Sequence, residues 1–443
     1  MNYLKAAKKH MRTLYKRLMD TCVNLTIHGP SFMVRKEVHY ICRIIYCIIY
    51  IHIWFAVVYT ICNYYNHYHK NPIRFTTRSD YLHWNTTYPS ITLCEKSIDN
   101  MGTNSNSDEN GTIKNPARYV DEIAFFEGTC FSCLSDCATE DAVCSSNFEK
   151  IVTDHRTTCE NFFSFCKWNT MPELCCKIFR PVQTEFGTCY TFNNNHVTEK
   201  AQFRSTMTTL NPDVLEINAF QDYEAFLHSS DDIPFWNMEY DRRITVPVGS
   251  EAHMIFSIVE IVNEPEVSMT SPEVRRCRFS DEVPPEFLSY KFYSYSVCIT
   301  ECRFAAQLAL CNCTHHLSPP EYKDRICDIE GLKCLTRNHD TLRSMMIPDG
   351  NVSGIECDCL PSCTEPDYNI VSNKLDEPVG QVISSIAWFT LGARPHQRIT
   401  RQVTRTPLDL VVAMGNCIGL FFGGSILSII EIVYYLCFRK WHV

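Results

Sequence analysis

The sequence predicts a membrane protein of mixed α and β structure, in which two membrane-spanning helices flank a large, disulfide-rich extracellular domain. Three observations predict this class. Two long apolar runs lie near the two ends of the chain, and basic residues gather outside the segment that the runs enclose. The chain also has 26 cysteines in 443 residues, a usage typical of an oxidising compartment rather than the cytosol.

The first apolar run, Ile41 to Cys62, has 22 residues and is interrupted only by Arg43 and His52. It is long enough to cross about 30 Å of hydrocarbon, so we predict a transmembrane helix over 41–65. The run is too long for the core of a signal peptide and no small-residue cleavage site follows it, which favours a signal anchor. We interpret Arg43 and His52 as snorkelling or interhelical residues rather than permeation residues.

The second apolar run, Leu408 to Phe438, has 31 residues. As one straight helix it would measure about 46 Å, at about 1.5 Å per residue, which is more than a bilayer requires. We predict a second transmembrane segment over 408–438 that tilts, protrudes or breaks.

The charges near the two runs predict the orientation. Residues 1–40 hold eight Lys and Arg against Asp20 and Glu37, and the second run is followed by "RKWHV". Because cytoplasmic flanks carry the excess of Lys and Arg, we expect segments 1–40 and 439–443 in the cytoplasm of a two-span plasma-membrane protein.

The segment 66–407 is then extracellular, with 30 Lys and Arg against 46 Asp and Glu, a net charge of −16. This charge indicates either a solvated acidic surface or enrichment of cations at the mouth of a pore.

The cysteines and the glycosylation sequons agree with this topology. Twenty of the 26 cysteines lie between the two runs, an even number that permits ten disulfides. Four expected N-glycosylation sites fall in the same segment, at Asn85, Asn110, Asn312 and Asn351.

Within the extracellular segment, alternating runs such as "RRITVPVG" and Glu251 to Val262 predict β-strands. The pattern of 293–310 predicts a helix that Pro319 and Pro320 stop. Residues 100–112 are expected to form a polar loop.

The cysteine spacing suggests how this helix is attached. Cys298 and Cys302 lie on one face of a helix with an axial rise of about 6 Å, and Cys357 and Cys359 lie on one side of an extended chain with a rise of about 6.6 Å. Antiparallel pairing would form nested bridges, each worth roughly 4 kcal/mol in the chain-entropy model. The bridges would be Cys302 with Cys357, Cys298 with Cys359, and Cys277 with Cys363. Other connectivities remain open, and zinc is the competing use of paired cysteines.

Several motifs carry a resemblance to a known family. "YSYSVCITECRFAAQLALCNCTHHLSP" and "CDCLPSCTEPDYNI" resemble the two cysteine blocks of the epithelial sodium channel, degenerin and acid-sensing channel family. "CENFFSFCKWNTMPELCCKIFRPVQTEFGTCYTFNN" and "WNTTYPSITLC" match best the pickpocket branch of arthropods. With "IHG" near the start and "GLFFGGSILSIIEIVYY" near the end, the resemblance covers almost the whole chain.

The resemblance implies a trimeric channel, made with identical or related subunits, whose ectodomain has a palm β-sheet with a helical thumb and finger. It supports the three nested bridges and implies Cys94–Cys189, Cys311–Cys334 and Cys313–Cys327 as well. Cys166 is expected to pair with Cys175 or Cys176. No pairing is assigned to Cys130, Cys133, Cys137, Cys144 or Cys159.

The second apolar run carries an unusual pattern of small and polar residues. Gly415, Gly419 and Gly423 recur every fourth residue, and the series 424, 428, 431 continues with Gly, Ser and Glu. Such a stripe must avoid lipid, either by close helix packing or by lining a three-fold axis, where backbone and serine oxygens would meet sodium. Adjacent glycines also make a helix break inexpensive where the backbone lines a wet path.

By resemblance, Gly423, Gly424 and Ser425 form the selectivity filter, with Gly at the middle position where Ala or Ser is more usual. Val412 falls where bulky residues hold degenerin channels open. Gly419 falls at a position that contributes to amiloride block.

Four polar positions complete the expected site. Glu431 is interpreted as an acid of the ion path rather than an interhelical packing acid, and Ser428 and Asp409 as pore-lining residues. His28 and Gly29 resemble the gating motif that precedes the first span, a re-entrant segment beneath the pore.

We therefore expect a subunit of a voltage-insensitive, amiloride-sensitive sodium channel, gated through its ectodomain by a ligand, protons or mechanical load. Na⁺ is the expected permeant ion, membrane lipid surrounds the spans, and no cofactor, structural metal, catalytic residue or nucleic acid is expected. The alternative is a non-conducting two-span receptor or accessory subunit, which would need no polar stripe. An ATP-gated channel would lack the cysteine blocks, and the enzyme motifs for nucleotides, zinc hydrolysis and serine nucleophiles are missing.

Overall fold

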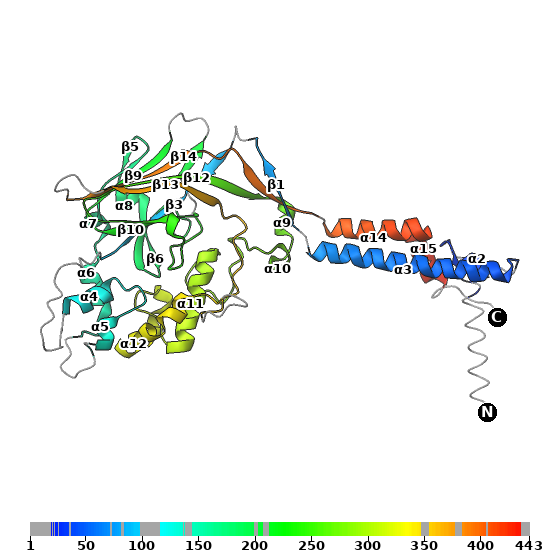
Figure 1. The fold of residues 1–443 in the computed structure, drawn as a ribbon, viewed down its shortest axis with the longest axis horizontal. Coiled ribbons are helices and arrows are strands. Elements are labelled where there is room, and N and C mark those ends of the chain that lie inside the picture. Colours follow the sequence, from blue (N-terminus) through cyan, green and yellow to red (C-terminus); the bar gives the residue numbers. More distant parts are fainter. Residues whose placement is uncertain are drawn as a thin grey trace, which may run out of the picture. The chain divides into compact units, whose positions relative to one another are not determined.

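The computed structural model describes residues 19, 21, 23–24, 26–34, 37–70, 73–80, 84–97, 116–135, 137, 144–198, 203–206, 212–346, 354–376, 383–404 and 406–435. The chain divides into two compact units, which are described separately (Figure 1). One unit combines residues 1–74 with 402–443, and the other comprises residues 75–401.

The first unit is helical. The helices of its described residues are α2 (Pro30–Val34), α3 (Tyr40–Lys70), α14 (Pro407–Phe422) and α15 (Ile426–Val433). α14 packs along α3, with the ring of Phe422 4.7 Å from that of Trp54 and 5.6 Å from that of Tyr50. The outward side chains of α3 are large and apolar, which is expected where lipid replaces water as the solvent.

α3 alone, among the helices of the described residues, is long and apolar enough to cross a membrane unaided. α14 and α15 meet the same criterion only together, as a pair bent by 75° at the break between them. The second apolar run, which was expected to tilt, protrude or break, is therefore broken.

The second unit is built on a large mixed sheet of eight strands. The order is β1-β15-β12-β14-β9-β4-β5, and β13 also pairs with β12. The strands are β1 (Ile73–Arg78), β4 (Phe163–Trp168), β5 (Met171–Glu173), β9 (Asp213–Ala219), β12 (Glu251–Asn263), β13 (Asp367–Asp376), β14 (Ser385–Ala393) and β15 (Arg398–Val403). The long strand β12 lies between β13 and β14 along its first part and pairs with β15 at its end. The expected strand over 251–262 is confirmed.

A second, antiparallel sheet has the order β11-β10-β3-β7-β6. It comprises β3 (Ser90–Glu95), β6 (Phe179–Thr184), β7 (Gly187–Phe192), β10 (Tyr223–His228) and β11 (Arg243–Val246), and a small two-stranded sheet pairs β2 (Asn85–Thr87) with β8 (Arg204–Thr206). The inward side chains of the two large sheets form one core, in which Tyr88 is fully buried and donates its hydroxyl to the carbonyl oxygen of Phe389 at 2.7 Å.

Helices form the rest of the second unit. They are α4 (Pro116–Ala124), α5 (Phe131–Ser135), α6 (Phe148–His155), α7 (Cys159–Phe162), α8 (Cys175–Ile178), α9 (Pro265–Ser268), α10 (Pro272–Arg275), α11 (Tyr295–Cys311), α12 (Ile329–Arg337) and α13 (His339–Arg343), with 3-10 turns η3 (Tyr240–Arg242) and η4 (Pro320–Arg325). A separate core joins α4 and α6 to α12 and α13 through residues such as Ile123, Ile151, Leu335 and Leu342.

The helix expected over 293–310 is present as α11, but the prolines do not end it. Ser294 caps its first turn by accepting from the N–H of Val297 at 3.2 Å, and Asn312 ends it in the left-handed conformation, with φ of 58°. Asparagine tolerates this conformation, which satisfies the last carbonyls of a helix. Pro319 and Pro320 instead begin η4.

Ten disulfides link the described part of the second unit. The three nested bridges form with Cα–Cα distances of 5.1, 5.8 and 6.0 Å for Cys277–Cys363, Cys298–Cys359 and Cys302–Cys357. The chain from 356 to 360, which carries Cys357 and Cys359, has no regular secondary structure. The other bridges are Cys94–Cys189, Cys130–Cys133, Cys137–Cys144, Cys159–Cys176, Cys166–Cys175, Cys311–Cys334 and Cys313–Cys327.

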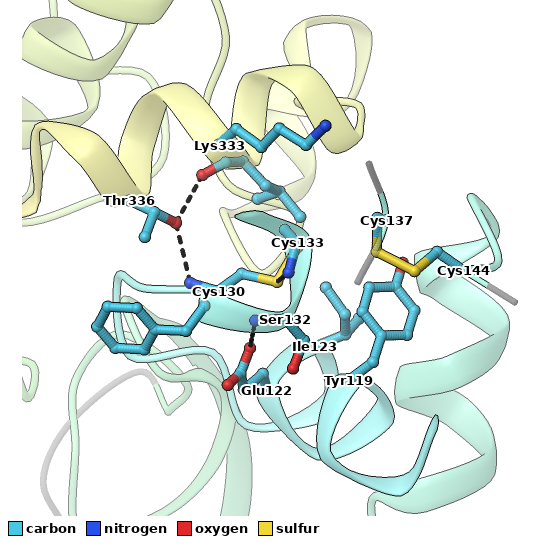
Figure 2. The surroundings of a disulfide bond; sticks show 12 residues. Tyr119, Glu122, Ile123, Cys130, Ser132, Cys133, Cys137, Cys144, Lys333 and Thr336 are labelled. Atoms are coloured by element: carbon cyan, nitrogen blue, oxygen red, sulfur yellow. Dashed lines mark hydrogen bonds between the residues drawn. A yellow bond between two sulfur atoms is a disulfide. The ribbon is translucent and has the colours of Figure 1, made fainter. Parts of the chain in front are cut away.

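Two of the bridges that had no assigned pairing lie close together beside α4 and α12 (Figure 2). Cys130 and Cys133 are fully buried, and the N–H of Cys130 donates to the hydroxyl of Thr336 on α12 at 2.9 Å. The N–H of Ser132 donates to Glu122 on α4 at 2.8 Å. The bridge thus closes a turn that α4 and α12 hold from two sides.

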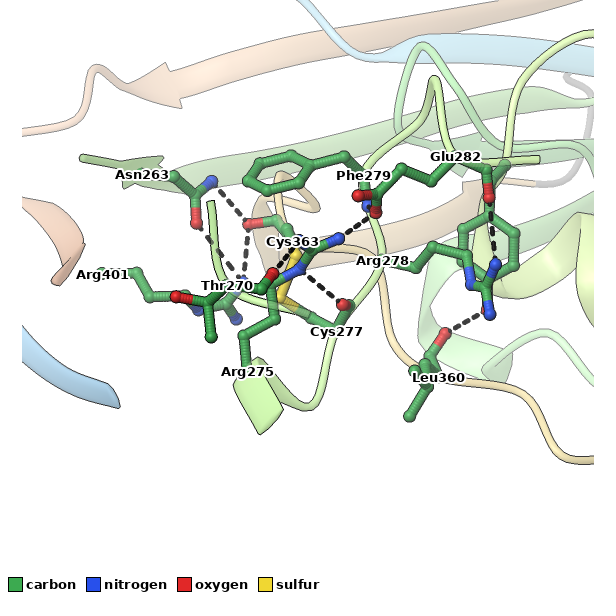
Figure 3. A network of polar contacts seen from close by, with 11 residues as sticks. Asn263, Thr270, Arg275, Cys277, Arg278, Phe279, Glu282, Leu360, Cys363 and Arg401 are labelled. Carbon is green, nitrogen blue, oxygen red and sulfur yellow. Dashed lines mark hydrogen bonds and ion pairs between the residues drawn. A yellow bond between two sulfur atoms is a disulfide. The ribbon is translucent and has the colours of Figure 1, made fainter. Parts of the chain in front are cut away.

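A polar network surrounds the Cys277–Cys363 bridge (Figure 3). The guanidinium of Arg401 donates to Sγ of Cys277 at 2.7 Å and to the carbonyl oxygen of Cys363 at 3.1 Å. Arg275 is buried and forms an ion pair with Glu282. Because a buried cation is costly unless it is paired, this network fixes the chain on both sides of the bridge.

Two of the four expected glycosylation sites lie in the described part of the chain. Asn85 on β2 and Asn312 at the end of α11 are exposed, as attachment of a glycan requires. Asn110 and Asn351 lie outside the described residues, as does the polar loop expected over 100–112.

Candidate functional site

The site expected to form a pore is a sharp break in the second apolar run. α14 ends at Gly423, whose φ of +61° lies in the left-handed region that glycine adopts without strain. The N–H of Gly423 donates to the carbonyl oxygen of Gly419 at 2.8 Å, and that of Gly424 to Ile418 at 3.4 Å. These bonds satisfy carbonyls that a helix end leaves without intrahelical donors.

α15 restarts directly after the break through a serine cap. Ser425 accepts from the N–H of Ser428 at 3.2 Å, and Ser428 accepts from the N–H of Ser425 at 3.2 Å. This reciprocal arrangement satisfies two donors of the first turn. Residues Gly423 to Ser425 therefore form an ordered link between two helices.

The segment before α3 lies against this link. The backbone N–H of His28 donates to the carbonyl oxygen of Phe422 at 2.8 Å. A Cβ added to Gly423 would lie 2.6 Å from Cδ2 of His28, far closer than van der Waals contact permits. Position 423 therefore requires glycine for two reasons, its backbone conformation and the histidine ring beside it.

Gly29 has a similar double requirement. Its φ is +117°, and a Cβ there would lie 2.4 Å from Cε2 of Tyr50 on α3. The His28–Gly29 pair therefore makes a tight turn between α3 and the end of α14. The structure thus explains why position 29 is a glycine, and it places His28 against the end of α14.

Thr26 links the N-terminal segment to α15. Its hydroxyl donates to Oε2 of Glu431 at 2.7 Å, and its backbone N–H lies 3.4 Å from the same oxygen. Because the Thr26 hydroxyl donates to the carboxylate, it accepts from the hydroxyl of Ser428, 3.0 Å away. Ser428 is only 2% exposed, so within the chain Ser428 and Glu431 face Thr26.

The small and polar stripe expected along one helix is interrupted. Gly415 and Gly419 belong to α14, whereas Ser428 and Glu431 belong to α15, and the two helices meet at 75°. Nothing lies within 4 Å of a Cβ added at Gly415, so this position is open. The break at the adjacent glycines thus places the two halves of the stripe on different helices, and the pore-lining role of Gly419, Ser428 and Glu431 stays a prediction.

At the start of α14, Asp409 completes a capping box with Thr406. Asp409 accepts from the N–H of Thr406 at 2.8 Å, and Thr406 accepts from the N–H of Asp409 at 3.2 Å. The carboxylate therefore has a structural role at the helix start, where negative charge is also favourable. Val412, one turn further along, is 50% exposed.

Sequence reasoning missed Thr26 and Asn416. Asn416 is an exposed amide on α14, and the series 409, 412, 416, 419, 423 places it on one face with Asp409 and Gly423. A polar side chain inside an apolar run was the feature that could have identified Asn416, but the glycines of this run were considered instead. Thr26 had no signal, because its partners lie about 400 positions away in sequence.

The second unit contains two acids with raised pKa that the sequence did not single out, the buried Asp232 and the half-buried Glu365. Asp232 accepts from the hydroxyl of Ser296 at 2.9 Å. Burial, and the nearby charge of Asp232, raise the pKa of Glu365 well above its ordinary range. The pKa of Asp232 is also raised, by burial first.

Comparison with known proteins gives a consistent result. Residues 21–435 match a family described as amiloride-sensitive sodium channel. The chain is 23% identical over 460 residues to sodium channel protein Nach of Drosophila ananassae, covering 96% of this chain and 87% of that protein. It is 25% identical over 319 residues to pickpocket protein 19 of Drosophila melanogaster, covering 64% and 61% of the two chains. It is 24% identical over 292 residues to the human bile acid-sensitive ion channel, covering 59% and 54%.

Proposed function

The chain belongs to the amiloride-sensitive sodium channel family, and we propose that it is a subunit of a trimeric sodium channel whose ion path runs past the break between α14 and α15. The observation that carries this proposal is the ordered break itself. A helix that only anchors a protein needs no left-handed glycine, serine cap or supporting histidine within its apolar run.

The chemistry of the break suits a partly dehydrated cation. A helix interruption exposes backbone oxygens, and Ser425 adds a hydroxyl at the same level. Hard cations such as Na⁺ prefer oxygen ligands, and a ring of three such subunits would present them around one axis. Gly423, Gly424 and Ser425 are therefore the proposed selectivity filter.

The break also provides the reason for proposing α14 and α15 as one membrane segment. Non-helical backbone at membrane depth is tolerated only where it is covered by protein or lines a wet path. In this chain His28 covers one carbonyl of the break, at Phe422, and a pore would hydrate others. We propose that both termini are cytoplasmic and that the protein resides in the plasma membrane.

The N-terminal segment is the proposed support of the pore on the cytoplasmic side. Thr26 holds Glu431, and His28 holds the end of α14. The hydrogen bond from Thr26 fixes the side chain of Glu431, and Glu431 then influences permeation from this fixed position near the filter. Glu431 is therefore proposed as an acid of the ion path whose carboxylate accepts a hydrogen bond from Thr26.

The proposed gating is through the ectodomain, voltage-insensitive and sensitive to amiloride, with identical or related subunits as partners. Protons, a small ligand and mechanical load are the candidate stimuli.

The test is voltage-clamp recording from cells that express the chain with Val412→Phe, a change that opens related channels without a stimulus. We expect a sodium-carried current that amiloride reduces and that Gly424→Ala or Ser425→Ala alters in its preference for Na⁺ over K⁺. Val411→Phe is the matched control, because Val411 is exposed on another face of α14.

A surface-delivered Val412→Phe chain that conducts nothing by itself would require a related subunit. If coexpressed relatives also failed to produce a current that depends on this chain, the channel proposal would be overturned in favour of a non-conducting receptor or accessory subunit.

A further inference from the structure

The second unit contains a cavity of about 350 Å³ where β3, β10 and β11 meet the end of α13. This volume is at the lower end of the range of small-molecule sites, about 300–1,000 Å³. Its walls combine three aromatic rings, Phe186, Trp236 and Tyr240, with charged side chains. None of these residues has a place in the proposed ion path.

The cavity is lined by three basic side chains and two acidic ones. Lys96 lies 3.1 Å from Glu127 and 3.5 Å from Glu224, and Arg243 lies 3.6 Å from Glu224. Burial opposes the charge of Lys96, but its two carboxylate partners raise its pKa above the ordinary value. Both acids of the cavity are therefore already paired.

Arg343 is the cation in excess. Arg343 lines the cavity, and it forms no ion pair with a carboxylate of the described residues. Three cations face two acids in an extracellular segment with a net charge of −16, so this cavity has the opposite charge from its surroundings. An unpaired guanidinium beside aromatic rings favours a ligand that brings a carboxylate.

The positions of Arg343 and Trp236 are fixed by one buried network. Arg303 and Glu185 are fully buried and form an ion pair, and Glu185 also accepts from the backbone N–H of Trp236 at 2.9 Å. Arg303 donates to the carbonyl oxygen of Leu342 at 3.0 Å, and Asn237 donates to that of Arg343 at 2.9 Å. The backbone that carries Trp236 and Arg343 is therefore held in place, which lowers the entropic cost of ordering this part of the cavity on binding.

We propose that this cavity binds a small organic anion, a carboxylate carried on an aromatic or apolar body, with Arg343 pairing with the carboxylate and Trp236, Phe186 and Tyr240 enclosing the body. A cationic ligand is disfavoured, because it would have to displace Lys96 or Arg243 from their acids. Binding at this cavity does not depend on whether the chain conducts ions.

Calorimetric titration of the purified full-length chain in detergent tests the proposal with three probes that share one body. The probes are 3-phenylpropionate, 3-phenylpropan-1-ol and 3-phenylpropylamine. They share one body and carry a negative, a neutral and a positive end group. We expect saturable binding of the carboxylate at millimolar concentration or below, and binding at least about tenfold weaker for the alcohol and the amine.

Arg343→Gln should weaken carboxylate binding at least about tenfold, and Arg343→Lys should weaken it less. Both variants keep the backbone carbonyl that Asn237 holds, so the end of α13 is retained. Arg337→Gln on α12 makes the same charge change at an exposed position and should leave binding unchanged.

Equal binding of the amine, an affinity that Arg343→Gln leaves unchanged, or no saturable heat with the carboxylate at millimolar concentration would each overturn the proposal.

Discussion

The imidazole of His28 occupies the space that a side chain at Gly423 would need, with Cδ2 2.6 Å from the position of a Cβ. The backbone N–H of the same histidine donates to the carbonyl oxygen of Phe422 at 2.8 Å, which fixes the end of α14. The residue before the first helix and the residue at the break therefore constrain each other.

We expect Gly423→Ala to reduce the sodium current of the Val412→Phe channel at least about tenfold. A left-handed alanine costs about 1–2 kcal/mol, and its methyl group would also displace His28. Gly415→Ala is the matched control, because nothing lies within 4 Å of a Cβ added at this position. Current amplitude per surface-labelled channel is the measurement. Equal currents from the two variants would contradict the contact with His28.

Thr26→Val should lower the current severalfold, because it removes the hydroxyl that donates to Glu431 while preserving the shape of the side chain. A hydrogen bond of this kind contributes about 1–3 kcal/mol. Thr26→Ser keeps the hydroxyl and should behave like the parent channel. In a double-mutant cycle, Thr26→Val and Glu431→Gln should be less than additive. Fully additive effects would show that the two residues act independently.

We expect the second unit to lose stability as the pH falls below neutrality, with His315 contributing. Its ring is fully buried and packs near Phe126, Phe304 and Trp236, and burial first, then the charges of His316 and Arg303, lower its pKa to about 3. A lowered pKa stabilises the fold above the unfolded value of about 6.5, and this stabilisation is lost as the pH falls toward 3. At about pH 5 the loss is about 2 kcal/mol.

His315→Phe should therefore flatten the dependence of thermal unfolding on pH, while retaining an aromatic ring in the same packing. His155→Phe, at an exposed position on α6, should leave the dependence as it is. An unchanged slope in His315→Phe would show that another group is responsible for the loss.

Removal of a bridge should cost more when the bridge closes a longer loop. Cys94→Ala with Cys189→Ala removes a bridge that no other bridge encloses, with a sequence separation of 95, and should lower the free energy of unfolding by about 4 kcal/mol. Cys130→Ala with Cys133→Ala opens a separation of 3 and should cost about 2 kcal/mol. Denaturant unfolding of the two double variants gives the comparison. Equal losses would show that the local contacts of Thr336 and Glu122 outweigh the loop entropy.

Features that depend on local spacing could be predicted from the sequence. The nested bridges follow from the rise per residue of a helix and of an extended chain, and the break follows from two adjacent glycines in an overlong apolar run. The end of α11 could not be predicted in the same way. Prolines are stronger helix breakers than asparagine, but the left-handed Asn312 intervenes first.

Features that depend on distant partners could not be predicted. The link from Thr26 to Glu431 joins residues 405 positions apart, and no pattern near either residue signals the other. The sequence shows only that an acid within an apolar run is costly in lipid, and this cost predicts a function for Glu431 without indicating its partner. The pairing of Cys130 with Cys133 and of Cys137 with Cys144 also needed the fold, since four nearby cysteines permit several pairings.

The nested bridges impose an order on biosynthesis. During synthesis, at about 5–20 residues per second, Cys302 can find its partner only after Cys357 emerges, and Cys298 and Cys277 must wait for Cys359 and Cys363. All three bridges therefore become possible within six residues of elongation, long after the local bridge of Cys130 and Cys133, which has been available for more than 200 residues. A chain truncated before residue 357 would present three cysteines without their native partners to the quality-control machinery of the secretory pathway, whichever stimulus the mature protein detects.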